Sequence, residues 1–232
     1  MRPLGSVRAF SSLWSCIWWR PTIAIAMIAV MFSVPLFAEC QCGGPTCCHC
    51  STPIILDVTG HGFQLTSLAD GVTFDFFGTG QPVQISWTSA SSGNAFLALP
   101  GSDGLVHNGK QLFGNETPQP QSTNPNGFIA LAVYDLPENG GNGDGIIDAN
   151  DKIFTSLRLW IDANHDGISQ PEELHTLPSM GVYSISLDYW LSQKKDQYGN
   201  QFRYRSTVNE GIPDSASGVD HVVYDVGLVW GN

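Results

Sequence analysis

Cysteine is absent after residue 50, and basic residues are few throughout the chain. The 232 residues contain 10 Lys and Arg against 21 Asp and Glu, which gives a formal net charge of −11 at pH 7. Phosphate groups repel a surface of this sign, so the composition argues against nucleic acid as a partner. The chain also lacks a Gly-x-Ser-x-Gly motif, a His-Glu-x-x-His motif and a phosphate-binding loop with its Lys. We therefore expect a protein that is not an enzyme, and the clustered carboxylates favour a cation as ligand.

Residues 1–38 have the pattern of a signal peptide. Their three arginines are accompanied by no acidic residue, and residues 23–38 are apolar except for one Ser and one Pro. This pattern predicts cleavage after Ala38 and an exported chain, either secreted or held at the cell surface. An uncleaved membrane anchor is the alternative, but the apolar run is short for a span of about 20 residues.

Residues 39–52 form a cysteine-rich segment that directly follows the signal. In an exported protein such a cluster predicts disulfides, although an odd number of cysteines leaves one thiol unpaired. Two alternatives stay open: a structural zinc site that includes His49, and lipid attachment at the first cysteine of the segment. The five cysteines are Cys40, Cys42, Cys47, Cys48 and Cys50.

Residues 53–232 are expected to form one α+β domain, with short antiparallel strands and hairpins and short helices around the metal loops. Short helices are predicted after Asn126, over residues 153–157, and from a capping-box pattern at residues 169–172 through Leu177. Strands are predicted over residues 53–57, 63–65, 72–77, 83–87, 182–190, 201–208 and 222–230.

The segment of residues 162–173, DANHDGISQPEE, carries the strongest chemical motif. Its oxygen-bearing residues recur at the spacing of an EF-hand loop, and calcium takes six to eight oxygen ligands. Gly167 permits the sharp turn that such a loop requires, while the alternative is an Asx-rich turn without metal. The expected ligands are the side chains of Asp162, Asn164, Asp166, Gln170 and Glu173 and the carbonyl of Ile168.

A second segment, residues 140–151 (GGNGDGIIDAND), has the later half of such a loop. Gly140 stands where the first Asp is wanted, and only Asp135, Glu138 or Asn139 is near enough in sequence to replace it. The terminal Asp resembles the loops of dockerin modules, and the alternative is a glycine-rich hairpin with surface carboxylates. The expected calcium ligands are Asn142, Asp144, Ile146, Asp148 and Asp151.

Six motifs occur in an order that resembles the calcium-dependent self-processing module of iron-regulated RTX-type exoproteins. The resemblance covers about residues 53–189, and it implies a module that folds on calcium and promotes cleavage of an Asp-Pro bond at its own start. The motifs are DVTGHG from residue 57, FDFFGTG from 74, GKQLFG from 109, GFIAL from 127, GDG from 143 and LRLWIDANHDGISQPEEL from 157.

Two departures from this resemblance change what it implies here. The aligned bond is Thr52-Pro53, and the chain contains no Asp-Pro pair, so the cleavage is not expected in that form. Several early loop positions, such as Thr59 and Thr79, are not acidic. We therefore expect Asp57 and Asp75 to be satisfied by backbone amides.

The sequence thus predicts an exported, non-enzymatic module that binds Ca²⁺ mainly to hold its fold. Two other functions are compatible with the same residues. One is calcium-triggered cleavage of a peptide bond within the chain. The other is surface adhesion, in which calcium stiffens a face that binds a cell-surface or glycan partner.

Overall fold

The computed structural model describes residues 51–209 and 222–231. The expected signal of residues 1–38 and all six cysteines lie outside the described residues, so the disulfide, zinc, lipid and cleavage predictions stay predictions. The expected domain boundary at residue 53 also stays a prediction. Among the described residues, no helix is both long and apolar enough to cross a bilayer.

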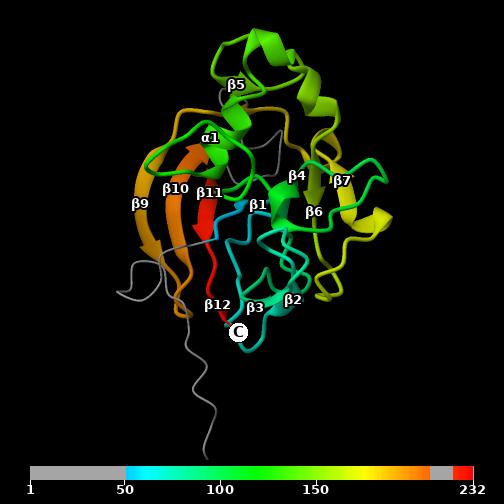
Figure 1. Ribbon diagram of the computed structural model, residues 1–232, viewed down its shortest axis with the longest axis vertical. Helices are drawn as coiled ribbons and strands as arrows, with labels where there is room; N and C mark the ends of the chain where they lie inside the picture. The colour runs from blue at the N-terminus through cyan, green and yellow to red at the C-terminus, as the bar shows by residue number, and fades with distance from the viewer. Residues whose placement is uncertain (1–50, 210–221, 232) are drawn as a thin grey trace, which may run out of the picture. The chain divides into compact units, whose positions relative to one another are not determined.

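The described residues are mainly β-structure, with one short α-helix and several 3-10 turns (Figure 1). The strands are β1 (Ile54–Asp57), β2 (Val72–Phe74), β3 (Val83–Ile85), β4 (Asn94–Ala98), β5 (Ile146–Ile147), β6 (Arg158–Trp160), β7 (Leu174–Thr176), β8 (Ile185–Ser186), β9 (Trp190–Lys195), β10 (Gln201–Thr207), β11 (Val222–Gly227) and β12 (Trp230–Gly231). The helices are α1 (Gly127–Ala132) and the 3-10 turns η1 (Gly109–Gln111), η2 (Pro137–Asn139), η3 (Lys152–Thr155), η4 (Pro171–Glu173) and η5 (Pro178–Met180).

A seven-stranded antiparallel sheet organises the domain, in the order β7-β6-β4-β1-β11-β10-β9. Figure 1 shows these strands from right to left in that order. The first and last long strands are neighbours at its centre, where Ile54 pairs with Asp225. A three-stranded sheet β12-β3-β2 and a two-stranded sheet β5-β8 complete the β-structure.

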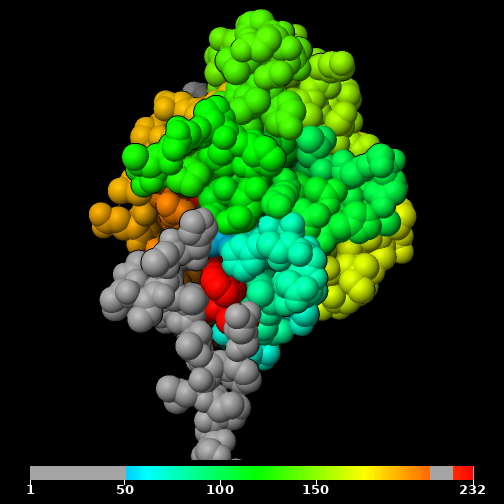
Figure 2. Space-filling model, viewed as in Figure 1, coloured from blue at the N-terminus to red at the C-terminus, as the bar shows by residue number. Residues whose placement is uncertain are grey.

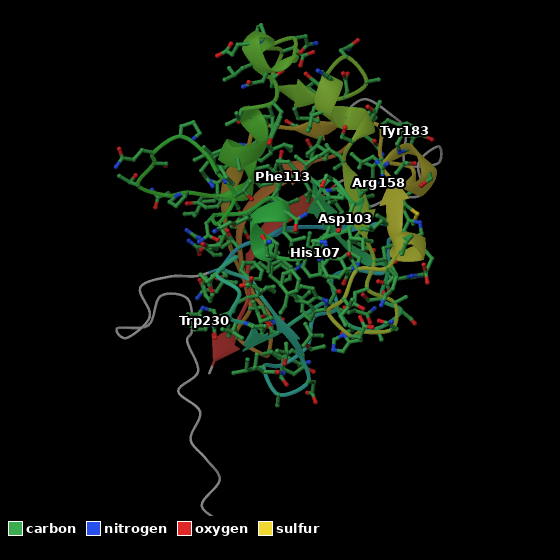
Figure 3. All side chains as sticks on the ribbon, turned by 45° about the vertical axis from the view of Figure 1, so that its right-hand side comes forward. Asp103, His107, Phe113, Arg158, Tyr183 and Trp230 are labelled. Carbon is green, nitrogen blue, oxygen red and sulfur yellow. The ribbon has the colours of Figure 1, made fainter. Side chains whose placement is uncertain are left out.

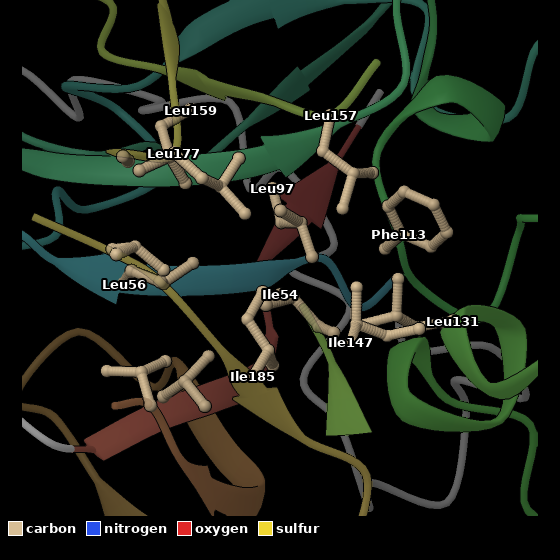
Figure 4. Close-up of a cluster of buried hydrophobic side chains, with 14 of the residues drawn as sticks. Ile54, Leu56, Leu97, Phe113, Leu131, Ile147, Leu157, Leu159, Leu177 and Ile185 are labelled. Carbon is tan, nitrogen blue, oxygen red and sulfur yellow. The ribbon is translucent and has the colours of Figure 1, made fainter. Parts of the chain in front are cut away.

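The central sheet separates two apolar cores because successive side chains of a strand point to opposite faces. On β1, Ile54 and Leu56 belong to one core and Ile55 to the other. The first core, shown in Figure 4, is completed by side chains from α1, β5, β8 and η3. The second core lies between the central sheet and the β12-β3-β2 sheet and is rich in aromatic rings. On the face drawn in Figure 2, the green segment between β4 and β6 covers much of the visible surface.

The predicted α+β class is wrong, because the described residues are β-rich and contain one α-helix of six residues. The error is clearest after the first acidic loop, where a helix through Leu177 was expected. Pro171 opens only the 3-10 turn η4, and Leu174 then begins β7, which pairs with Trp160 of β6. The backbone groups after the loop are satisfied by a strand partner, so the loop joins two antiparallel strands and not two helices.

Local predictions elsewhere in the chain agree more closely with the structure. Asn126 caps α1 as expected, since its side chain accepts the N–H groups of Phe128 and Ile129. The predicted strand over residues 201–208 is confirmed as β10, but its hairpin partner β9 begins only at Trp190, where the predicted strand of residues 182–190 ends. An irregularity between Phe202 and Tyr204 also shifts the register of this hairpin. The two rings therefore pack against opposite cores and not on one face as a regular strand would place them.

Candidate metal-binding loops

The first acidic loop, residues 162–173, lies between β6 and η4. Asp162 is 1% exposed, and its Oδ2 accepts the indole N–H of Trp87 at 2.8 Å and the Gly167 N–H at 2.9 Å. Its Oδ1 accepts the Asp166 N–H at 3.1 Å. The first predicted ligand of the loop is therefore held in place by three neutral donors.

Glu173, at the far end of the same loop, is held in a similar way. It is 6% exposed, and its Oε2 accepts the indole N–H of Trp160 at 3.1 Å and the Gln170 N–H at 3.3 Å. Its Oε1 accepts the N–H of Ala163 at 3.0 Å, so the side chain folds back over the start of the loop. The structure thus brings the two ends of the predicted loop together.

Between these ends, the polar side chains of the loop bond to one another. Asp166 Oδ2 accepts the side-chain amides of Asn164 at 2.9 Å and of Gln170 at 3.0 Å. The Gln170 Oε1 atom is buried and has no hydrogen-bond partner among the described residues. Ile168 donates its N–H to Asp166 Oδ1, and its side chain is exposed. Three predicted ligand side chains therefore converge, and an oxygen at the ninth loop position lacks a donor.

His165 anchors the first acidic loop to its surroundings. Its Nδ1 lies 2.9 Å from the Thr88 carbonyl oxygen and its Nε2 lies 2.8 Å from the Asp70 carbonyl oxygen. Each ring nitrogen of His165 therefore faces a backbone carbonyl oxygen. The backbone of His165 is left-handed, with φ of 59°, so the contacts hold the loop in a conformation that few residues adopt.

The second acidic loop, residues 140–151, recruits its missing carboxylate from outside the motif. Asp135 is 7% exposed, and its side chain accepts the N–H groups of Gly143 at 3.0 Å and Gly145 at 2.9 Å. Gly145 occupies the same loop position as Gly167. Asp135 therefore takes the place of the first ligand, one of the three replacements that the sequence allowed.

Asp151 closes the second loop as Glu173 closes the first. It is 2% exposed and accepts the N–H of Asp148 at 2.8 Å and that of Asn142 at 3.3 Å. Burial raises the pKa of Asp151, and the negative charges of Asp135 and Asp148 add to this effect against the two backbone hydrogen bonds. These carboxylates therefore lie close enough to repel one another.

The remaining predicted ligands of the second loop bond locally. Asn142 donates its side-chain N–H to Asp144 Oδ2 at 2.7 Å, and Asp144 Oδ1 accepts the Ile146 N–H at 2.9 Å. Asp148 accepts the N–H of Asn150 at 2.7 Å. The pattern around Asp144 repeats that around Asp166 in the first loop.

The two loops thus share one hydrogen-bond scheme despite their different ends. In each, a buried first carboxylate accepts the N–H of the sixth-position glycine, and a buried last carboxylate accepts the N–H of the ninth residue. Across residues 51–209 and 222–231, no three or more His, Cys, Asp and Glu side chains are close enough together to hold a metal ion by themselves. A cation in either loop would therefore also need amide and carbonyl oxygens, which both loops contain.

Within residues 51–209 and 222–231, no basic side chain forms an ion pair with these buried carboxylates. The one ion pair in the described part of the chain joins Asp103 to His107 at 2.7 Å, far along the sequence from both loops (Figure 3). The hydrogen bond from His107 lowers the pKa of Asp103, whose side chain is exposed. The loop carboxylates rely on neutral donors alone.

The two earlier aspartates behave as expected. Asp57 accepts the N–H groups of Thr59, Gly60 and Gly62, and Asp75 accepts those of Thr79 and Gly80. These contacts confirm that backbone amides satisfy both carboxylates.

Trp87 and Trp160 are the functional residues that sequence reasoning missed. Both side chains are 0% exposed, and their ring centroids lie 5.5 Å apart in the core. Trp190 is 48% exposed on β9. Their role could have been suspected only from the need of a buried indole for an acceptor.

The architecture and loops define a β-rich domain with two acidic, glycine-containing turns. Residues 54–228 match the family model of the SPM domain, and the chain therefore belongs to the SPM domain family. It is 38% identical over 144 residues to the iron-regulated protein FrpA of Neisseria meningitidis serogroup C. This similarity confirms the relation to RTX-type proteins that the six motifs indicated. The alignment covers 61% of this chain and 12% of the relative, so the chain spans only a small part of that protein.

Proposed function

We propose that the described domain is an exported calcium-binding module in which the ion mainly stabilises the fold. The observation that supports this function best is the hydrogen-bond scheme common to the two acidic loops. Each loop buries two carboxylates against neutral donors, and burying unpaired charge is costly unless a cation compensates it. Calcium suits these loops because it takes six to eight oxygen ligands, and both loops carry side-chain and backbone oxygens.

In the first loop, the ion would be held by Asp162, Asn164, Asp166, Gln170 and Glu173 with the Ile168 carbonyl. The unpartnered Oε1 of Gln170 fits this assignment, since it is a buried acceptor at a ligand position. In the second loop, Asp135 would join Asn142, Asp144, Ile146, Asp148 and Asp151. We therefore assign two calcium sites, although the resemblance to EF-hand and dockerin modules extends to the loops and not to flanking helices.

The proposals for partner, localisation and activity rest on the family relation and on the charge of the chain. Export agrees with the relation to RTX-type proteins, and the acidic surface disfavours nucleic acid. No reaction is assigned to the loops, and Thr52 before Pro53 removes the carboxyl group needed for Asp-Pro cleavage. Adhesion to a cell-surface or glycan partner stays a prediction.

Thermal unfolding with and without calcium tests the proposed function. Chelator-treated protein is expected to melt at a lower temperature than protein in millimolar calcium, because a ligand that binds only the folded state stabilises it. Calorimetric titration is expected to count two sites. Asp166→Ala should remove most of the stabilisation, whereas Asp70→Asn, an exposed aspartate outside both loops, should keep it. Equal melting temperatures in chelator and calcium would overturn the calcium assignment.

A further inference from the structure

The strand β9 forms an open edge of the central sheet. Among the described strands it pairs only with β10, and Figure 1 shows it as the leftmost arrow. Five of its six residues are exposed, whereas the opposite edge strand, β7, has only three residues. An edge of this kind carries a row of N–H and C=O groups that can pair with another extended chain. β9 is therefore the longer of the two edges to which a further strand can add.

The hairpin of β9 and β10, residues 190–207, is basic although the chain is acidic. It contains four basic residues and one acidic residue, while the chain as a whole has a net charge of −11. Over residues 51–209 and 222–231, none of the four cations forms an ion pair with a carboxylate. The four are Lys194, Lys195, Arg203 and Arg205. This basic hairpin therefore attracts negatively charged groups, which the acidic remainder of the chain repels.

One face of β9 presents Lys194 and Trp190. Lys194 is paired with Phe202, whose ring lies in the second core, and its ammonium group is held over aromatic rings. Its Nζ lies 5.0, 4.4 and 5.1 Å from the ring centroids of Phe63, Phe202 and Tyr224 respectively. Trp190 is 48% exposed and lies opposite Arg205 on the same face. This face thus offers a cation in a fixed position and an apolar ring.

The other face of β9 presents Leu191 and Lys195. Leu191 is 71% exposed and is paired with Tyr204, whose ring packs against the first core. Lys195, next along the strand from the lysine of the first face, points to this side because successive side chains alternate. A hollow of about 450 Å³ is lined by residues 191–195 and, among others, by Arg203. Each face of the edge therefore combines one apolar side chain with one lysine.

We propose that β9 docks an extended acidic peptide of a partner protein, which adds to the outer edge of the sheet as a further strand. Carboxylates of the peptide face Lys194 and Lys195, and its apolar side chains cover Trp190 and Leu191. In such a complex, backbone hydrogen bonds along the edge supply affinity, and the side chains on both faces supply specificity.

Two other occupants fit this edge less well. A second copy of β9 brings its own two lysines to the edge, so like charge opposes self-pairing. An anionic membrane surface is flat and meets only one face of the strand, whereas the lysines lie on both faces. The docking goes beyond calcium binding and does not rest on it, because no residue of the basic hairpin lies in either acidic loop.

Fluorescence anisotropy of the full-length chain in millimolar calcium tests the docking. The labelled probe is the peptide Glu-Glu-Thr-Thr-Val-Val, whose antiparallel alignment places Glu opposite the two lysines of β9 and Val opposite Trp190 and Leu191. We expect saturable binding that weakens as salt is added. The peptide Lys-Lys-Thr-Thr-Val-Val should bind at least about tenfold more weakly. The acidic peptide N-methylated at every residue should lose binding, because it has no N–H to donate to the edge.

Lys195→Glu should raise the Kd for the acidic peptide at least about tenfold, because it places like charge beside the bound carboxylates. Leu191→Ser, which removes an exposed apolar contact, should also weaken binding. Lys110→Glu is the matched control and should leave the Kd unchanged, since Lys110 is an exposed lysine on η1, outside the basic hairpin. Melting curves check that every variant is folded.

The inference is overturned if the acidic peptide does not bind, or if its basic or N-methylated version binds as tightly. It is also overturned if folded Lys195→Glu keeps the original Kd. Binding to vesicles of phosphatidylglycerol without binding to the peptide would assign the hairpin to a membrane surface and would likewise exclude the peptide.

Discussion

The indole N–H of Trp87 donates a 2.8 Å hydrogen bond to Oδ2 of Asp162, joining the aromatic core to the first residue of an acidic loop. Trp160 makes the equivalent contact with Glu173 at the other end of the loop. The two rings pack against each other, so the loop ends rest on one rigid platform. Ligand positions that are held in advance lose less entropy when an ion binds.

Trp87→Phe should therefore weaken both folding and calcium binding. The change removes one donor to a buried carboxylate, which is expected to lower the free energy of unfolding by about 1–3 kcal/mol. Urea denaturation measures this loss, and calorimetric titration measures the affinity for calcium. Trp190→Phe is the control, since Trp190 is exposed and lies on β9. Unchanged stability and affinity in Trp87→Phe would contradict the platform role.

Asp135→Asn should reduce the number of bound calcium ions from two to one. Asp135 replaces the ligand that Gly140 cannot supply, so the second loop without its charge should lose most of its affinity. A calorimetric titration counts the ions, and Glu138→Gln is the control because Glu138 is exposed in the adjacent turn. If Asp135→Asn still binds two ions with unchanged affinity, the second site is built from other residues.

Gly141→Ala should disrupt the second loop without replacing a ligand residue. A Cβ at residue 141 would lie 2.2 Å from the backbone carbonyl of Asp135, which must then move. We expect lower thermal stability and loss of the second calcium ion. At Gly101, a Cβ would meet no atom closer than 3.2 Å, so Gly101→Ala serves as the control. A Gly141→Ala protein that keeps both ions would show that Asp135 need not be held so closely.

Asp225→Asn should make the domain more stable at neutral pH. Burial raises the pKa of Asp225 from an ordinary value of 3.8 to about 6 in the folded protein. Its favourable contribution to folding is therefore complete below about pH 4 and is lost as the pH rises through 6, by up to about 3 kcal/mol. Urea denaturation between about pH 4 and pH 8 should show a smaller pH dependence in the variant. An identical pH dependence in both proteins would exclude this role of Asp225.

The oxygen-bearing residues of the loops could be read from the sequence, because ligand spacing is a local property. The surrounding fold could not, since a capping-box pattern at Ser169 competes with strand pairing between β6 and β7. Ser169 instead exchanges hydrogen bonds with the backbone of Val106, 63 residues away. Long-range pairing of this kind overrides helix signals and leaves no mark on the local pattern.

The contacts of buried polar groups could not be predicted from the sequence for the same reason. Asp135 was one of three possible replacements, and only its hydrogen bonds to Gly143 and Gly145 select it. The contact between Thr52 and Asp225 spans 173 residues of sequence. No spacing rule connects residues so far apart, although both are polar residues within predicted apolar strands or at their ends.

The pairing of β1 with β11 also has a consequence for when the domain can fold. Because one central partner comes from residues 54–57 and the other from residues 222–227, the middle of the sheet cannot form until β11 has been synthesised. Such distant pairings are slow to close. A nascent chain halted before β11 would keep one flank of β1 open, with the backbone N–H and C=O groups of that edge unpaired.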